Sequence, residues 1–340
     1  EDRAAVDEAL SSGWLSRGPK VGEFEEALAA YLQLPDDQVV IATNSCTAAL
    51  EVGLAAVCGP RLDERMAVIV PALTFPAAPN VVARMGGKVV LADVDPVTLM
   101  MTEATWEHAR RRAEAQGLTV VATMPTHLYG ALSDTSWLTR QGHPVVEDAA
   151  HAFGAAWRHD GRPYGAVRND RHAVAFSFHA IKNLTTGEGG ALVVRRDVAE
   201  RIRPYVLQGM TPGAWARYEG GAAKAHYDVS MVGAKLNMAD PAAALGLSQL
   251  ARFPEGQRRR LHLAARYFDA IGDRGLWDLL EEPWTGIDFG VEHAWHLFVV
   301  RLWSDRLDVT RDRVIDELAE QVDGANVHFD VLTRHSDAPR

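Results

Sequence analysis

The sequence predicts an α/β fold in three layers: a mainly parallel seven-stranded sheet with helices on both faces, followed by a smaller C-terminal α+β domain. Short β-branched runs alternate with longer helical patterns between Val39 and Val194. The runs are apolar throughout, as in parallel strands that are buried on both faces. The chain has 340 residues, of which 47% are hydrophobic, so it can bury a large core.

Seven runs are the strand candidates, and they cover residues 39–42, 67–70, 88–91, 118–122, 144–146, 174–178 and 191–194. Helical patterns between them cover residues 47–57, 75–85 and 103–116. Ligands of parallel sheets bind at the carboxyl ends of the strands. The residues that follow these runs are therefore the first candidates for a functional site.

The pattern changes after about Gln208. Residues 210–228 are rich in Gly, Trp and Tyr and predict a long irregular segment, which in a compact domain is more often functional than idle. Beyond it we expect a helix from Asp240 through Phe268, a strand at 297–302, a helix at 310–321 and a strand near 326–329. The chain then divides into a large domain at 1–206, an irregular substrate or dimer segment at 207–240, and a long helix with a small domain at 241–340, whose end we expect to be incomplete.

Charge and composition exclude several classes of protein. Lys and Arg number 35 against 45 Asp and Glu, which gives a net charge of −10 and disfavours sequence-independent binding to nucleic acid. No apolar run approaches the roughly 18–20 residues that span a bilayer. Two cysteines, Cys46 and Cys58, are too few for a disulfide scaffold. We therefore expect a cytoplasmic protein.

Lys182 is a candidate nucleophile. It follows the run that ends at Phe178 and precedes the glycine-rich turn at 185–190. A lysine at a strand end beside compact glycine turns can be desolvated, which lowers its pKa and makes its amine available for a Schiff base. A surface lysine in a loop is the alternative.

Two further strand ends carry polar groups. Asp148 ends the run that begins at residue 144, where a carboxylate can hold a pyridinium nitrogen protonated, or can cap a helix. Ser45, Cys46 and Thr47 lie between a strand and a helix. The N–H groups of the helix start and the nearby hydroxyls can bind a phosphate without a lysine, although ordinary N-capping explains the same residues.

One aromatic residue and two histidines complete the candidates. Phe75 follows another strand end, where it could stack on a planar cofactor or be an apolar core contact. His127 and His151 could carry protons or be hydrogen-bonded core histidines, and for His127 we favour the core.

These parts are complementary. Together they make a site for pyridoxal 5′-phosphate (PLP). At successive strand ends they supply a phosphate-binding helix start, an aromatic ring for stacking, an acid for a ring nitrogen, and a lysine. The G-x-G-x-x-G and P-loop patterns are absent, and no closely spaced His/Cys/Asp/Glu cluster predicts a metal site.

The chain resembles the fold-type-I PLP-dependent aminotransferases of nucleotide-linked keto sugars, the DegT/StrS type, whose fold is like that of aspartate aminotransferase. The resemblance covers nearly the whole chain. Its motifs are residues 13–21, 45–50, 70–75, 93–96, 127–130, 147–151, 177–190, 233–240, 293–298 and 327–329. Residues 95–102, 178–183 and 293–296 are most similar to the enzymes that make UDP-4-amino-4-deoxy-L-arabinose. Ala234, Leu236 and residues 330–332 depart from the family pattern near the expected sugar site.

The resemblance implies roles for the candidate residues. Lys182 would hold PLP as a Schiff base and, once released by the amino donor, move the proton between the substrate Cα and the cofactor C4′. Asp148 would pair with the pyridine nitrogen, and His151 would assist near O3′. Phe75 would stack on one ring face. The residues expected to hold the phosphate are Ser45, Cys46, Thr47 and Ser177.

The same resemblance implies a homodimer with shared active sites. Asn237 would reach the phosphate of the partner subunit, and Lys235 is a second candidate there. The residues expected to contact substrate are His179, Lys235, His328 and Phe329.

The leading hypothesis is a ping-pong transaminase. L-Glutamate would convert PLP to pyridoxamine 5′-phosphate, and a nucleotide-linked keto sugar, preferably a 4-keto sugar, would then take the amine. One alternative keeps the fold but takes a keto-cyclitol as acceptor and glutamine as donor. An alternative of another class is a non-catalytic PLP-fold regulator or sensor, which would need a lost lysine or a broken phosphate loop. Lys182 and the phosphate loop are both present.

Overall fold

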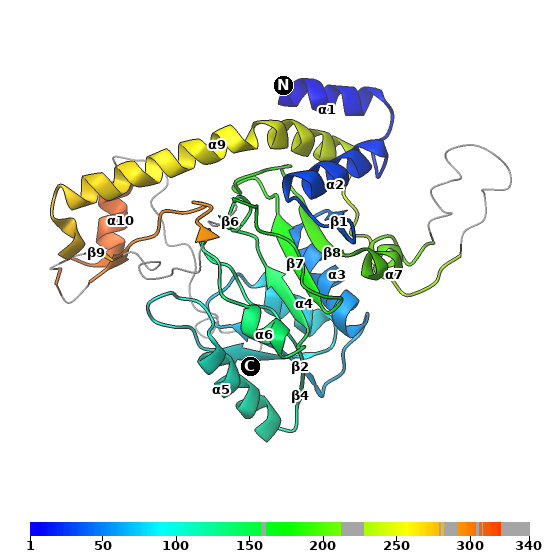
Figure 1. Ribbon diagram of the computed structural model, residues 1–340, viewed down its shortest axis with the longest axis horizontal. Coiled ribbons are helices and arrows are strands. Elements are labelled where there is room, and N and C mark those ends of the chain that lie inside the picture. The colour runs from blue at the N-terminus through cyan, green and yellow to red at the C-terminus, as the bar shows by residue number, and fades with distance from the viewer. Residues whose placement is uncertain are drawn as a thin grey trace.

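The computed structural model describes residues 1–157, 161–211, 228–278, 280–281, 291–303, 306–307 and 309–320. Seven strands in this part of the chain form one sheet in the order β1-β8-β7-β5-β4-β2-β3 (Figure 1). Their bounds are β1 Gln38–Thr43, β2 Met66–Pro71, β3 Lys88–Ala92, β4 Thr119–Thr123, β5 Val145–Asp148, β7 His172–Ser177 and β8 Gly190–Arg195. Neighbours pair in parallel except that β8 is antiparallel to both β1 and β7. The predicted mainly parallel seven-stranded sheet is confirmed, and each predicted run overlaps one strand.

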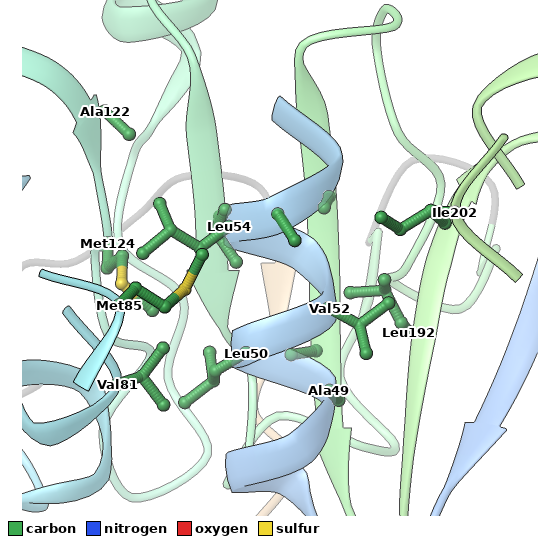
Figure 2. Close-up of a cluster of buried hydrophobic side chains, with 14 of the residues drawn as sticks. Ala49, Leu50, Val52, Leu54, Val81, Met85, Ala122, Met124, Leu192 and Ile202 are labelled. Carbon is green, nitrogen blue, oxygen red and sulfur yellow. The ribbon is translucent and has the colours of Figure 1, made fainter. Parts of the chain in front are cut away.

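Helices cover both faces of the sheet. One face packs against α3 (Cys46–Cys58), α4 (Ala77–Arg84) and α7 (Arg196–Val206). The other packs against α2 (Pro19–Tyr31), α5 (Glu103–Ala115), α6 (Ser136–Arg140) and α9 (Asp240–Gly272). Figure 2 shows the core on the α3 side, where Leu50 and Leu54 of α3 approach Val81 and Met85 of the α4 region. Alternate residues of each strand serve the two faces, as the pleat requires.

The remaining elements are short or lie near the chain ends. They are α1 (Asp2–Ser11), the pairs β6 (Ala156–Trp157) with β10 (Val291–Glu292) and β9 (Leu280–Glu281) with β11 (Arg301–Leu302), the 3₁₀ helix η3 (Leu276–Asp278), and α10 (Arg311–Ala319). The sequence patterns did not predict α1, α2 or α7. Within the described residues, no helix combines the length and apolar character needed to cross a membrane.

The predicted strand at 297–302 is wrong over most of its length, since only Arg301 and Leu302 pair as a strand. The backbone before them is bonded elsewhere: the N–H of Leu297 donates to Tyr129 O at 3.0 Å. The predicted strand at 326–329 lies outside the described residues. Of the segment 210–228 the structure describes the two ends, where Met210 pairs with Val229.

Side chains satisfy the open edge of β1. Glu25 of α2 accepts a hydrogen bond from the N–H of Ala42 at 2.9 Å, and Arg203 of α7 donates to Val40 O at 3.1 Å. Arg203 also donates to Glu25 at 3.0 Å. An edge strand otherwise presents unpaired N–H and C=O groups. The pair from α2 and α7 therefore closes this edge.

One carboxylate joins the starts of two helices. Asp240, the first residue of α9, is buried and accepts hydrogen bonds from the N–H groups of Gly18, Lys20 and Val21 at 2.7, 3.1 and 3.2 Å. These N–H groups belong to the start of α2, where the helix itself offers no acceptor and a negative charge is favourable. Asp240 thus fixes α2 to the start of α9.

Replacing Asp240 by Asn should lower the free energy of unfolding by about 1–3 kcal/mol, because charge-assisted bonds to buried N–H groups are lost. Urea denaturation followed by tryptophan fluorescence measures the change. Asp7→Asn, on an exposed position of α1, is the matched control and should change stability by about 0.5 kcal/mol or less. Equal effects of the two changes would contradict the capping role of Asp240.

Candidate active site

The antiparallel strand β8 brings a glycine to the carboxyl edge of the sheet. Gly190, its first residue, is paired with Thr43 at the end of β1 and with Ser177 at the end of β7. Asp148 ends the next strand, β5, where it pairs with Ala175. The residues that follow β1, β7 and β5 therefore meet at one edge.

The start of α3 is a candidate anion site. Ser45 is the N-cap of this helix and accepts a hydrogen bond from the N–H of Ala48 at 3.1 Å, so the ordinary capping role is present. Cys46 and Thr47 begin the helix, where N–H groups have no intrahelical acceptor and the helix dipole is positive. Such a helix start can still bind a phosphate, because one cap satisfies one of several N–H groups.

Gly190 allows the sheet to approach this helix start. A Cβ atom on residue 190 would lie 2.5 Å from the carbonyl carbon and oxygen of Ser45 and 2.6 Å from the amide nitrogen of Cys46. The side chain of Ser177 is buried on the neighbouring strand. Backbone N–H groups from α3 and a hydroxyl from β7 therefore gather around one small region.

Lys182 and Cys46, both half-buried, share a site with the buried Asp148. Lys182 lies in the turn after β7, where its N–H donates to His179 O at 2.9 Å. Burial lowers the pKa of the Lys182 amine, and the charges of Asp148 and Cys46 oppose that shift. Burial, together with the charge of Asp148, raises the pKa of the Cys46 thiol well above its ordinary value. The pKa values of these groups are thus coupled through their charges in a partly desolvated site.

Asp148 is the buried carboxylate of this site. Its side chain is 3% exposed, and burial raises its pKa, while the N–H of Ala150 at 3.1 Å and the charge of Lys182 lower it. The residues after it form turns rather than an α-helix. The alternative of a helix N-cap is therefore wrong for Asp148, although it does bind a local N–H.

The two candidate histidines differ in their surroundings. His127 is fully buried, and Ser133 N–H donates to its Nδ1 at 2.9 Å, so the core interpretation is confirmed. His151 accepts a hydrogen bond from the N–H of Tyr129 on its Nδ1 at 3.2 Å, which places the proton of the neutral ring on Nε2. Its ring lies 4.4 Å from the ring of His296.

Phe75 is not a core residue, since 56% of its side chain is exposed. Its neighbour Thr74 is buried, with its hydroxyl 2.8 Å from the hydroxyl of Thr126. Thr126 in turn forms a backbone bridge with Asp148. Phe75 therefore lies at the same sheet edge as Asp148, and its side chain is exposed at the surface.

The structure places Asn237 beside the phosphate-binding region of its own chain. Asn237 bridges Thr43, and the N–H of Asn44 donates to Leu236 O at 2.8 Å. The Oδ1 atom of Asn237 is buried without a hydrogen-bond partner within the described residues. Lys235 is exposed. The expectation that these residues serve the partner subunit stays a prediction.

Of three further predicted substrate residues, the structure describes one. His179 lies beside the cluster, because its N–H donates to the Ser177 hydroxyl and its C=O accepts from Lys182 N–H; its side chain is half-exposed, with Nε2 3.5 Å from Glu188 Oε1. His328 and Phe329 fall outside the described residues.

The sequence patterns assigned no role to Asn183, which follows Lys182. Its amide nitrogen donates to Ala294 O at 2.8 Å and to Phe153 O at 3.3 Å, and its Oδ1 lies 3.2 Å from His296 Nδ1. Asn183 thus ties the lysine turn to the segment that carries His296, which stacks near His151. The signal in the sequence was an amide directly after a candidate lysine, but its partners lie 30 to 113 positions away.

The site supplies what PLP needs: N–H groups for a phosphate, a buried carboxylate for a ring nitrogen, and an amine of lowered pKa between them. The close approach at Gly190 leaves no side chain between the helix start and Ser177. These residues therefore fit the cofactor that the sequence predicts.

Gly190→Ala should lower stability by about 1–3 kcal/mol, because the added Cβ overlaps the backbone of the α3 start. Gly22→Ala in α2 is the matched control. A Cβ there meets no atom within 4 Å, so it should raise stability by about 0.5–1 kcal/mol. Thermal unfolding of both variants checks the pair, and a neutral Gly190→Ala would show that the contact is not tight.

Comparisons with known proteins agree with this geometry. A model described as the DegT/DnrJ/EryC1/StrS aminotransferase family matches residues 1–340. Spr1654 of Streptococcus pneumoniae, assigned as a sugar aminotransferase and solved in its pyridoxamine phosphate and PLP forms, is 28% identical; the match to the first form covers 98% of this chain and 84% of that one, with a TM-score of 0.79.

Two further solved structures are similar. AtS13 from Actinomadura melliaura is 29% identical, with the same coverage of 98% and 84% and a TM-score of 0.79. The aminotransferase TlmJ from Streptoalloteichus hindustanus is 30% identical over 94% of this chain and 79% of that one, with a TM-score of 0.74. From the family match over its whole length, the chain belongs to the DegT/DnrJ/EryC1/StrS aminotransferase family.

Proposed function

We propose that this aminotransferase moves an amino group from L-glutamate to a nucleotide-linked keto sugar by a ping-pong mechanism, with a 4-keto sugar as the first choice of acceptor. The observation that carries the proposal is that Lys182 and Asp148 share one site beside the candidate anion site at the start of α3. The similar Spr1654 is assigned as a sugar aminotransferase, which supports a sugar acceptor. Within that class, the resemblance of residues 95–102, 178–183 and 293–296 favours a UDP-linked 4-keto pentose.

The cofactor is PLP, which when bound supplies an aldehyde carbon for amines and a protonated ring that accepts electron density. Lys182 is placed to capture that carbon, because its lowered pKa leaves more of the amine uncharged at neutral pH. Once displaced, the same amine can take and return a proton at the reacting carbon. Asp148 holds the proton on the ring nitrogen from the neighbouring strand end.

The other predicted residues bind and orient. The N–H groups of Cys46 and Thr47 and the hydroxyls of Ser45 and Ser177 would hold the phosphate. The exposed face of Phe75 would cover one side of the ring. His151 would offer its Nε2–H near O3′, because its Nδ1 is already bonded to the backbone.

We further propose a homodimer in which Asn237 and Lys235 contribute to the partner's site. Aliphatic side chains near these residues and near Lys182 are strongly exposed: Val232 by 70% and Ile181 by 66%. A second copy that covers them would remove this apolar surface from water. The remaining candidates for substrate contact are His179, His328 and Phe329.

Lys182→Ala should abolish the visible absorbance of the bound cofactor and lower turnover at least about a hundredfold, because both the covalent link and the proton carrier are lost. Absorbance spectra and a coupled glutamate assay measure the two effects. Lys88→Ala, at an exposed position, should retain both. A Lys182→Ala protein with the wild-type spectrum and full turnover would contradict the proposal.

The acceptor can be identified with the pyridoxamine form of the enzyme. Each member of a panel of nucleotide-linked 3-keto and 4-keto sugars and keto-cyclitols is added, and recovery of the PLP spectrum is followed. We expect recovery with 4-keto sugars, and a faster first half-reaction with glutamate than with glutamine. Recovery with keto-cyclitols alone would overturn the sugar acceptor, and no response to any amino donor would overturn aminotransfer.

The pH dependence of covalent capture tests the state of Lys182. Since burial lowers its pKa below the ordinary 10.5, capture should rise at a lower pH than for a solvated lysine and fall only as the pH drops through the lowered value. Borohydride trapping of PLP at a series of pH values, with mass spectrometry of the Lys182 peptide, records the profile. The Lys88 peptide in the same samples is the internal control, and coincident profiles would argue against desolvation of Lys182.

A further inference from the structure

The residue before Asp148 is a second buried carboxylate. Glu147 lies in β5 with its side chain fully buried. Successive residues of a strand point to opposite faces of the sheet. Asp148 shares the α3 face with Val146, whereas Glu147 shares the α6 face with Val145. The carboxylates of Asp148 and Glu147 therefore point to opposite faces of the sheet.

Donor groups surround both oxygens of Glu147. The Tyr164 hydroxyl donates to Oε2, and His127 Nε2 lies 3.3 Å from the same oxygen. The Thr135 hydroxyl donates to Oε1, and His172 Nε2 lies 3.1 Å from it. A carboxylate offers about four lone-pair sites. Each oxygen of Glu147 thus faces two donors.

The backbone fixes which histidine nitrogen carries the proton. Ser133 N–H donates to Nδ1 of His127 at 2.9 Å, and Arg168 N–H donates to Nδ1 of His172 at 3.0 Å. A ring nitrogen that accepts a hydrogen bond cannot carry a proton, so each ring is neutral with its proton on Nε2. His127 Nε2 lies 3.3 Å from Glu147 Oε2 and 3.0 Å from the Tyr164 hydroxyl, whereas His172 Nε2 lies close to Oε1 without forming a hydrogen bond.

Glu147 is therefore ionised. Burial alone would raise its pKa, but the contacts with His172 and His127 outweigh burial and hold its pKa well below the ordinary value. The Tyr164 and Thr135 hydroxyls and, at 3.3 Å, the His127 ring solvate the charge in place of water. Arg168 donates to the Thr135 hydroxyl at 3.3 Å, so this hydroxyl links the Arg168 guanidinium to the Glu147 carboxylate.

The same contacts reach the backbone of Asp148. His127 N–H donates to Asp148 O at 3.0 Å, and Asp148 N–H donates to Pro125 O at 2.8 Å. Through the His127 side chain, Glu147 thereby anchors the loop at 125–133 against Asp148, the residue that follows Glu147. That loop also provides the Tyr129 N–H that orients His151.

We propose that Glu147 is a positioning residue of the cofactor site: a buried anion, held by the Tyr164 and Thr135 hydroxyls and His127, that locks the 125–133 loop under Asp148 and adds a second negative charge behind it. The proposal rests on the proposed role of Asp148 at the ring nitrogen. The titratable groups that face Glu147 are His127, His172 and Tyr164, and those near Asp148 are Lys182 and His127.

The first test needs neither cofactor nor a variant of Glu147. Long-range ¹⁵N–¹H NMR of the ¹⁵N-histidine-labelled apoprotein distinguishes ring nitrogens with and without protons, and His127→Gln and His172→Gln assign the two signals. We expect the Nε2–H form of both rings at pH 7, because the Nδ1 atom of each accepts a backbone hydrogen bond. A doubly protonated ring at pH 7 would overturn the proposal, because the charge of Glu147 would then be neutralised locally.

The second test follows the ring nitrogen of ¹⁵N-labelled PLP as a function of pH. Glu147→Gln should lower the pKa of that nitrogen by about one unit, as expected for the loss of a partly screened negative charge on the neighbouring residue. Glu147→Asp, which restores the charge, should recover most of the shift, whereas loss of shape alone would leave both variants equally changed. Glu26→Gln, on the exposed surface of α2, is the charge-matched control and should not move the titration.

Asp148→Asn separates this inference from the proposed function. If Asp148→Asn shifts the ring-nitrogen titration and Glu147→Gln does not, the role of Glu147 is overturned and that of Asp148 stands. If neither variant shifts it, the proposed role of Asp148 is itself wrong.

Discussion

The geometry of the site depends on the close contact between the start of β8 and the start of α3. Gly190 touches the backbone of Ser45 and Cys46, and its strand neighbours are Thr43 and Ser177. Because β8 runs antiparallel to its neighbours, it places Gly190, which has no side chain, where β1 and β7 end and α3 begins. The N–H groups of α3 and the hydroxyl from β7 can therefore act on one ligand group, and the lysine turn begins beside them.

Short-range pattern was enough to predict the sheet but not its surroundings. Each of the seven strands predicted for the sheet was an apolar run whose burial shows in its own residues. The sequence patterns missed α1, α2 and α7, and in two of these helices polar residues, Glu25 and Arg203, are partly or fully buried where they satisfy the edge of β1. The predicted strand at 297–302 failed because the backbone of Leu297 bonds to Tyr129, a partner 168 positions away that no local pattern reveals.

Candidate site residues could be predicted where they follow strands. Lys182, Asp148 and Cys46 were each ambiguous in isolation, and the structure brings them within reach of each other's charge. Asn183 and Glu147 carried no such signal, because their importance comes from partners that the fold supplies: Ala294 for the first and two histidines for the second. A buried polar residue is recognised by what it bonds, and the sequence does not contain that information locally.

The bonds from Asp240 to the start of α2 join residues about 220 positions apart. A nascent chain that has not yet reached residue 240 has no acceptor for these N–H groups, so α2 and the Glu25 it carries lack their anchor beside β1. The edge of the sheet then stays open throughout the synthesis of its seven strands, which end at Arg195. Open strand edges are where partly folded chains associate. The synthesis of α9 therefore supplies the anchor that holds α2 and Glu25 over the β1 edge of the sheet.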